Sequence, residues 1–297
     1  MRSPEITVII PAVNLLSDLR DCLGALQRQD SVELEILVLD RLGPDVRDPL
    51  GREFPDAKIV AMDSDATIPQ MRAKGFELAS ADLVAVIEDH VIVPPDWASK
   101  LLQAIENGAD VAGGPIENMA VEKRVDWAAF LCEYSACLPP LESGKSSWLP
   151  GNNIVYKKSL IDQYAPVIAE GKWENRLHDA MRDDGVDLIM VPDLIVGHKM
   201  HYTFNLYMSQ RYLYARSYAG GRVVGKSLPV RFLYGLAAFI LPPLLFFRTV
   251  KNIRSKGRHL DQLVPSLPML FAFVWSWGFG EVVGYWFGAG KSLSKVR

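Results

Sequence analysis

Three consecutive residues, Glu88, Asp89 and His90, follow an apolar run and carry side chains of the types that hold divalent metal ions. Glu88 and His90 flank a single residue, so a carboxylate oxygen and an imidazole nitrogen could both reach one ion. Such an ion could hold a diphosphate and neutralise the charge of a leaving group. Two oxygen ligands would suit Mg²⁺, whereas exchanging one oxygen for imidazole shifts the preference toward Mn²⁺. Without further context, so short a cluster is equally compatible with a solvated turn.

A second candidate is Glu174, in the segment Trp173-Glu174-Asn175. Its carboxylate could act as a general base that takes the proton of an attacking hydroxyl. Because Glu174 lies near an expected helix start, the alternative is that it only stabilises the helix dipole. His198 and His201 follow a strand-like run, and each is either structural or a third metal ligand.

Two nucleotide-binding motifs are missing from the sequence. No Gly-x-Gly-x-x-Gly follows the first apolar run, where residues 11–14 read Pro-Ala-Val-Asn, and no Gly-x-x-x-x-Gly-Lys-Ser/Thr occurs. This pattern argues against a dinucleotide-binding Rossmann enzyme and against a P-loop nucleotidase.

Short apolar runs alternate with segments of helical spacing along the first two thirds of the chain. This alternation predicts an α/β fold with a mainly parallel central sheet. Ligands bind such sheets beyond the carboxyl ends of the strands, where Asn14, Asp40 and the 88–90 segment lie. Strands are expected at 6–10, 35–40, 58–62, 83–87, 110–113, 154–156, 188–191 and 194–196, and helices from Ser17 or Asp18 to Leu26 and at 69–79, 97–107 and 173–184.

The formal net charge of −3 over 297 residues hides a sharp division. Residues 1–198 contain 18 Lys and Arg against 33 Asp and Glu, whereas residues 199–297 contain 14 against 2, so the net charges are −15 and +12. The division predicts an acidic domain at 1–200 and a basic, membrane-associated helical region at 201–297. We interpret the basic region as a partner of anionic membrane lipid and not of nucleic acid.

Two apolar elements, 232–247 and 263–288, lie within the basic region. They contain uncharged runs of 16 and 18 residues, close to the shortest lengths that span a bilayer, and the alternative is a pair of buried core helices. Five cations from Arg248 to Arg258, together with Pro242-Pro243, favour an element that enters the membrane and returns over a spanning hairpin. The N-terminus has no signal-peptide pattern, so we expect the acidic domain on the cytoplasmic side of the inner membrane.

The order of these segments resembles that of the family 2 glycosyltransferases with a GT-A fold, in a membrane-associated bacterial form. The resemblance covers roughly residues 6–200. Glu88-Asp89-His90 stands where that family has its Asp-x-Asp metal motif, and Trp173-Glu174-Asn175 is similar to its Glu-Asp base motif. The other similar segments are 8–14, 35–40, 72–75, 150–153 and 195–198.

The resemblance implies an inverting hexosyltransferase of cell-envelope polysaccharide biosynthesis. It would move a sugar from a nucleotide-sugar to a hydroxyl of a lipid-linked or polysaccharide acceptor. It implies a divalent metal, Mn²⁺ or Mg²⁺, on Glu88, His90 and His198, and a base at Glu174, since Asn175 cannot accept a proton. Because the metal motif departs from Asp-x-Asp, the alternative is a catalytically impaired GT-A-like membrane scaffold in a polysaccharide assembly complex. The implied nucleotide-sugar contacts are Pro11, Asn14, Asp40, Arg72, Asp89, Gly151 and Asn152.

Overall fold

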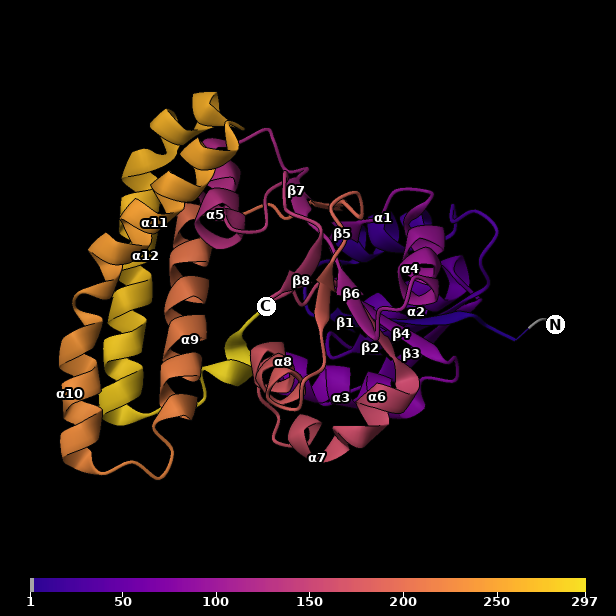
Figure 1. Ribbon diagram of the computed structural model, residues 1–297, viewed down its shortest axis with the longest axis horizontal. Coiled ribbons are helices and arrows are strands. Elements are labelled where there is room, and N and C mark those ends of the chain that lie inside the picture. The colour runs from indigo at the N-terminus through magenta and orange to yellow at the C-terminus, as the bar shows by residue number, and fades with distance from the viewer. Residues whose placement is uncertain (1–2) are drawn as a thin grey trace. The chain divides into compact units, whose positions relative to one another are not determined.

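The computed structural model describes residues 3–297, which form two compact units (Figure 1). The first unit comprises the chain up to Glu117 together with Pro139–Lys199. The second unit comprises Asn118–Leu138 and Met200–Arg297, so a segment from the middle of the chain joins the C-terminal part. The first unit contains a large sheet with helices, and the second is built mainly from helices.

An eight-stranded sheet forms the centre of the first unit, in the order β3-β2-β1-β4-β9-β6-β10-β8. Four of its seven neighbouring pairs are parallel, which confirms the predicted α/β fold with a mainly parallel sheet. β9 runs antiparallel to both of its neighbours, and β8 runs antiparallel to β10. The strands are β1 (Ile6–Ala12), β2 (Leu34–Asp40), β3 (Ala57–Ala61), β4 (Leu83–Ile87), β6 (Val111–Gly113), β8 (Gly144–Ser146), β9 (Asn153–Lys157) and β10 (Leu188–Met190).

Continuous apolar sequence explains why β1 lies in the middle of this sheet. All seven of its residues are buried, and a strand covered on both faces must be apolar on both. Its neighbours are also buried toward their ends, where β4 is apolar throughout and β2 is apolar up to its last residue, Asp40. The helices of this unit are α1 (Leu16–Leu26), α2 (Pro44–Glu53), α3 (Ile68–Leu78), α4 (Trp97–Glu106), α6 (Lys158–Gln163), α7 (Ala165–Ile168) and α8 (Glu174–Asp183).

Helix α3 packs closely on β1, and this contact fixes the residues on its inner face. At its start, the Gln70 N–H donates to Thr67 Oγ1 (3.3 Å) and the Thr67 N–H donates to Gln70 Oε1 (2.8 Å). A Cβ added at Gly75 would lie 2.5 Å from Cγ2 of Ile9, so a larger residue would displace the helix or the strand. Arg72, one turn before Gly75, is therefore held against the sheet.

A second, small sheet places a histidine beside the chain that follows β4. Its strands are β5 (Val91–Ile92), β11 (Val196–His198) and β7 (Ile116–Asn118), in the order β5-β11-β7. β11 runs antiparallel to β5 and pairs His198 with Val91.

Two local predictions are wrong. Helix α1 begins at Leu16 after Leu15, and not after Ser17 or Asp18, because the Asp18 carboxylate accepts a hydrogen bond (3.3 Å) from the Leu15 N–H. The expected strand at 194–196 starts only at Val196, because it follows a turn at residues 192–193, in which the N–H of residue 194 bonds to the oxygen of residue 191.

Four helices were not predicted: the short α6 and α7, and α2 and α5, which have no apolar stripe of helical period. α2 buries only Leu50, so its sequence reads as a polar loop. Helix α5 (Arg124–Tyr134) belongs to the second unit and is buried on nearly all sides, so its apolar residues follow no period.

The second unit also contains α9 (Phe204–Arg222), α10 (Leu228–Ala238), α11 (Leu241–Lys256) and α12 (Leu260–Phe287). Small residues separate α9 from α12. A Cβ added at Gly280 or Gly284 would lie 2.5 or 2.6 Å from a main-chain oxygen of α9, and Ala215 and Ala219 of α9 face these glycines. This Gly-x-x-x-Gly arrangement against Ala-x-x-x-Ala brings the two helix backbones into contact.

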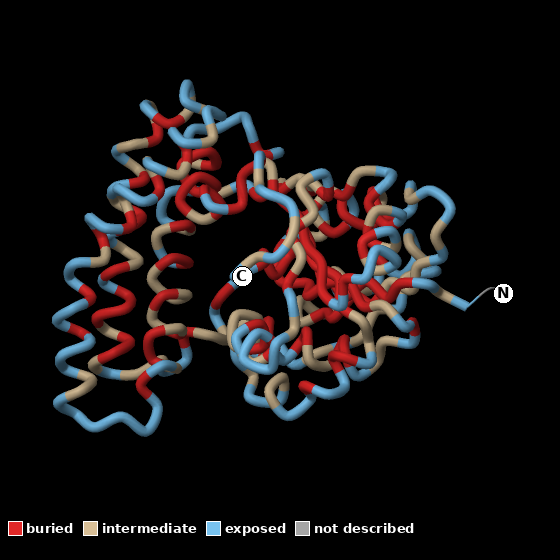
Figure 2. Tube along the Cα trace, in the orientation of Figure 1, coloured by how far each residue is buried: buried red, intermediate tan, exposed pale blue. Residues whose placement is uncertain are grey.

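Within residues 3–297, α12 is the single helix that is by itself long and apolar enough to cross a membrane. α10 and α11 reach that length only as a pair, which is bent by 47°. The break falls at residues 239–240, just before Pro242-Pro243. Many positions of α10 and α11 are exposed (Figure 2). The large apolar side chains exposed there are Leu228, Phe232, Leu233, Tyr234, Leu236, Phe239, Ile240, Leu244 and Phe247.

Candidate active site

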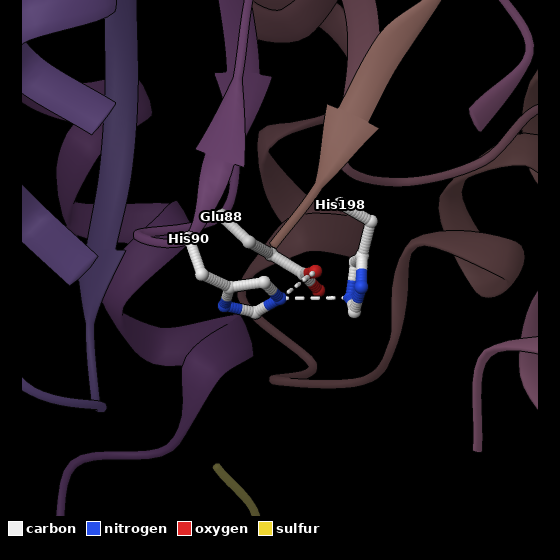
Figure 3. A group of neighbouring side chains, drawn as sticks. All are labelled: Glu88, His90 and His198. Carbon is white, nitrogen blue, oxygen red and sulfur yellow. Dashed lines mark hydrogen bonds and ion pairs between the residues drawn. The ribbon is translucent and has the colours of Figure 1, made fainter. Parts of the chain in front are cut away.

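Glu88, His90 and His198 meet at one point of the first unit (Figure 3). Glu88 and His90 follow the carboxyl end of β4, and His198 ends β11. The Nε2 atom of His90 lies 2.8 Å from Nε2 of His198 and 3.4 Å from Oε2 of Glu88. One ligand atom from each residue lies within 4.8 Å of the other two. The structure therefore brings together the three residues predicted to bind the metal.

Asp89 orients His90 from the side away from this point. Asp89 Oδ1 lies 2.9 Å from Nδ1 of His90, so the Nδ1–H can donate to it and the Nε2 lone pair faces the other ligands. The other Asp89 oxygen accepts the backbone N–H groups of Val13 (2.7 Å) and Asn14 (2.8 Å). Asn14 Nδ2 also donates to Asp89 (2.8 Å). Asp89 is fully buried, so it ties the turn after β1 to the ligand loop.

Two neighbours hold the Glu88 carboxylate. Asn152 Nδ2 donates to one oxygen of Glu88 (2.8 Å), and Arg72 Nη2 lies 4.0 Å from the other. Burial by itself would raise the pKa of Glu88. The hydrogen bond and charge of His90, together with the charge of Arg72, hold that pKa well below its ordinary value. Glu88 is therefore a carboxylate at neutral pH, as a metal ligand must be.

Of the two imidazoles, His90 is protonated at neutral pH and His198 is neutral. Burial lowers the pKa of His90, but the hydrogen bonds and charges of Asp89 and Glu88 outweigh it and raise the pKa to about 10. Burial, aided by the charge of His90, holds the pKa of His198 well below its ordinary value. An imidazole ligates only when neutral, so a divalent ion would replace the proton of His90. One carboxylate and two imidazoles, one of them oriented by Asp89, fit a divalent metal ion.

Arg72 connects this metal group to Glu174. Its Nη1 donates to Glu174 Oε2 at 2.6 Å, while its Nη2 points toward Glu88. The Arg72 side chain is 8% exposed and that of Glu174 is 25% exposed, so the carboxylate reaches solvent and the guanidinium does not. Glu174 is the first residue of α8 and also lies at the positive end of the helix dipole. The two interpretations of Glu174 are therefore compatible.

Gly151 is needed for the close approach of Glu174. A Cβ added at Gly151 would lie 2.4 Å from Cδ and 2.6 Å from Oε1 of Glu174. A pocket opens at this point, and it is lined also by Arg72, Tyr156 and Trp173. Any larger residue at Gly151 would push the carboxylate out of its place in the pocket.

Tyr156 and His178 form a buried polar pair beside Glu174 that the sequence patterns do not reveal. Tyr156 Oη lies 2.8 Å from His178 Nε2. Burial lowers the pKa of His178 to about 4 and raises the pKa of Tyr156, so both side chains are neutral at neutral pH. His178 follows Glu174 by four residues on α8, so the two side chains share a helix face. This spacing is the signal by which the pair could have been found.

The predicted nucleotide contacts Pro11 and Asp40 lie at the carboxyl ends of β1 and β2. Pro11 is buried within β1, and Asp40 pairs in register with Ala12. The Asp40 carboxylate accepts the Leu42 N–H (2.8 Å) and Arg47 Nε (2.9 Å), and its side chain is 1% exposed. Asp40 therefore already has partners within the chain.

His201, the other histidine considered as a third ligand, belongs to the second unit. Its Nδ1 lies 3.0 Å from Asp126 and 3.8 Å from Glu122. His198, and not His201, groups with Glu88 and His90.

A family model described as glycosyl transferase family 2 matches residues 7–147. This part of the chain, slightly less than half of it, is therefore similar to the family 2 glycosyl transferases. The match confirms the predicted resemblance and includes the strand ends with Asn14, Asp40 and the 88–90 segment. Gly151, Glu174 and His198 lie beyond the matched residues.

Two curated proteins are similar to part of this chain. A dolichol-phosphate mannosyltransferase of Pyrococcus furiosus is 28% identical over 126 residues, 38% of this chain and 36% of the relative. A glucosyl-dolichyl phosphate glucuronosyltransferase of Haloferax volcanii is 34% identical over 73 residues, 24% of this chain and 23% of the relative. The chain therefore matches about a third of the first relative and less than a quarter of the second.

Solved structures resemble a larger part of the chain. Residues 1–349 of S. aureus TarS match with a TM-score of 0.52 at 13% identity, covering 72% of this chain and 64% of that one. The same protein in complex with UDP matches with a TM-score of 0.53 at 13% identity, covering 70% and 63%. At this identity the likeness concerns the fold, and it confirms the predicted GT-A-like architecture.

Proposed function

We propose that the protein is an inverting glycosyltransferase that moves a sugar from a nucleotide-sugar to a hydroxyl of its acceptor. The observation that carries this proposal is the position of Arg72, 2.6 Å from Glu174 and 4.0 Å from Glu88. The buried Arg72 guanidinium thereby lies between the Glu174 carboxylate, which reaches solvent, and the Glu88 carboxylate, a proposed metal ligand. An inverting transfer needs a base for the acceptor hydroxyl and positive charge for the leaving diphosphate, and this site offers both.

The proposed cofactor is a divalent ion on Glu88, His90 and His198. Two imidazoles among three ligands favour Mn²⁺ over Mg²⁺. When bound, the ion would supply positive charge that stabilises the departing diphosphate. Asp89 and Asn152 hold the ligands in place through their hydrogen bonds to His90 and Glu88.

Glu174 is the proposed base. It would take the proton of the acceptor hydroxyl onto a carboxylate oxygen as that hydroxyl attacks the anomeric carbon. Arg72 fixes the position of this carboxylate, and the missing side chain at Gly151 leaves room beside it. Asn14 and Asp40, at the carboxyl ends of the strands, are proposed to lie toward the nucleotide, with Pro11 shaping the turn that carries Asn14.

The proposed location is the cytoplasmic face of the inner membrane, with a lipid-linked acceptor. Support comes from the length and composition of α12 and from the exposed apolar side chains of α10 and α11. Two relatives are named for dolichol phosphate, in agreement with a lipid-linked acceptor. Cations gather near both ends of α12, from Arg248 to Arg258 and from Arg222 to Arg231, which favours a re-entrant or in-plane unit over a simple crossing.

A labelling experiment tests this location. Single cysteines in the 248–260 segment should resist a membrane-impermeant thiol reagent added to intact cells and react after lysis. Ready labelling from outside would contradict the re-entrant arrangement and favour a spanning hairpin.

A donor screen tests the reaction. Membranes that contain the protein are supplied with single nucleotide-sugars and a lipid extract, and the release of nucleoside diphosphate is measured with Mn²⁺ and with a chelator. We expect one donor to support release that requires both the ion and the extract. Absence of release across the panel, from folded protein that retains its binding partners, would contradict the proposal and favour the scaffold.

A further inference from the structure

Three arginines of the second unit surround the C-terminal end of α12. Arg231 of α10 donates from Nε and Nη2 to two main-chain oxygens of the last helical turn (3.0 and 2.9 Å). Arg216 of α9 donates from Nε to the main-chain oxygen just after the helix (3.1 Å). Arg222, the last residue of α9, donates from Nη1 to the hydroxyl of Tyr285 (3.3 Å). We call Arg216, Arg222 and Arg231 the arginine cluster.

The hydrogen bonds to the end of α12 use only some of the N–H donors of the arginine cluster. Cations at a helix C-terminus stabilise the free carbonyl groups, as these bonds do. Each guanidinium has five N–H donors, however, and these bonds use one or two of them. The accepting oxygens are neutral, and within residues 3–297 no carboxylate lies within 4 Å of the cluster. Glu281 acts electrostatically on Arg222 without forming an ion pair with it.

Exposed apolar side chains adjoin the cluster in the chain. Val224 is 80% and Leu228 75% exposed, and both lie in the segment that links Arg222 to Arg231. Phe287, the last residue of α12, is 72% exposed. A ligand that satisfies this surface has a negatively charged head and an apolar body.

We propose that the arginine cluster binds the phosphate of an anionic phospholipid, with the exposed apolar side chains against its acyl chains. Guanidinium groups match phosphate oxygens in geometry and charge. Because bonds to the chain already position them, little side-chain freedom is lost on binding. The proposal rests on the membrane location proposed above and is independent of the transfer reaction. Free phosphate would satisfy the charges but not the apolar side chains.

The test uses the full-length protein in neutral detergent. It is titrated with dioctanoyl phosphatidylglycerol, dioctanoyl phosphatidylcholine or glycerol phosphate, and binding is followed by tryptophan fluorescence, since Trp286 lies next to the cluster. We expect phosphatidylglycerol to bind about tenfold more tightly than the other two, the effect of one or two charge-assisted hydrogen bonds. Arg222→Gln should weaken that binding about tenfold, and Arg231→Lys should weaken it while keeping the charge.

Arg52→Gln is the matched control, because it removes one exposed arginine from α2 of the first unit, which the proposed lipid contact does not include. It should change the affinity by less than about twofold. Equal affinities for the two lipids, or equal effects of Arg222→Gln and Arg52→Gln, would overturn the proposal. Equal binding of glycerol phosphate would assign the cluster to a free anion and overturn its lipid part. If the protein binds neither of the two lipids and no vesicles, the proposed membrane location is wrong. If it binds vesicles equally well with and without Arg222→Gln, only the role of the arginine cluster is refuted.

Discussion

The first unit buries its large apolar side chains in the sheet, whereas the second unit exposes many of them on α10, α11 and α12. All of β1 is buried, while Phe232, Phe247 and Phe279 are each more than half exposed. The residues that face each other between α9 and α12 are small, namely glycine and alanine. Large side chains outside and small ones between helices are typical of packing in lipid, where apolar burial gives helices no reason to associate.

The arginines differ as well. Arg47 and Arg72 of the first unit and Arg211 of the second form ion pairs with carboxylates, whereas the arginine cluster at the end of α12 does not. This contrast agrees with the proposal that the transfer site and the membrane contact belong to different units. Substitutions in one unit should then leave the task of the other unchanged, and four predictions test this.

The largest effect is expected for Glu174→Gln in the first unit. Loss of the general base should lower the rate of transfer about 1,000-fold, because the amide cannot take the hydroxyl proton. Binding of the nucleotide-sugar and of vesicles should be unchanged, as measured by titration and co-sedimentation. Glu170→Gln is the control, since Glu170 is a neighbouring acid paired only with exposed cations. Near-normal turnover of the Glu174 variant would remove Glu174 from the base role.

Gly284→Leu should damage the second unit. The added side chain meets the backbone of α9, where a Cβ alone would lie 2.6 Å from an oxygen, and we expect a loss of about 3 kcal/mol. Thermal unfolding in detergent and limited proteolysis measure this loss. Gly221→Leu is the control, because a Cβ at Gly221 meets nothing within 4 Å. If both variants are equally stable, the small-residue contact is not what holds α9 to α12.

His178 should make the first unit less stable in acid. Burial lowers its pKa to about 4, so the unfolded chain, with a histidine pKa near 6.5, binds more protons between these values. Stability is complete above pH 6.5 and falls toward pH 4, by about 2 kcal/mol at pH 5. His178→Gln should remove this loss in unfolding measured at pH 7.5 and 5. Tyr156→Phe should retain the loss of stability in acid, since burial is the main cause of the low pKa of His178. A steep loss of stability that persists in His178→Gln would assign the loss to another group.

Asn152→Ala should have the smallest effect and act on the metal alone. Without the amide donor the Glu88 carboxylate is less well fixed, and affinity for Mn²⁺ should fall about tenfold. Paramagnetic resonance of free Mn²⁺ measures this change. Asn107→Ala, at an exposed site on α4, should leave the affinity unchanged. A parallel loss of lipid binding in Asn152→Ala would contradict the separation of the two units.

Much of the fold of the first unit was predictable because its strands are continuous apolar runs. β1, β2, β3 and β4 lie within one or two residues of their predicted ranges. The site was predictable only as a set of candidates. That Asp89 would face away from the metal and hold the turn after β1 is a consequence of its burial, which residue type does not reveal.

The sequence by itself determined which segments are strands, which residues can ligate or take a proton, and how charge divides along the chain. Only the tertiary structure decided which candidates meet. His198 reaches His90 across 108 positions, and Glu174 reaches Arg72 across 102. Strand periodicity is a local property of neighbouring residues, whereas these contacts depend on β11 pairing with β5 and on α3 packing against β1 through Gly75. The C-terminal end of α12 is a second example. The composition of α12 predicts an apolar helix, but only the packing shows that arginines from two other helices lie at its end.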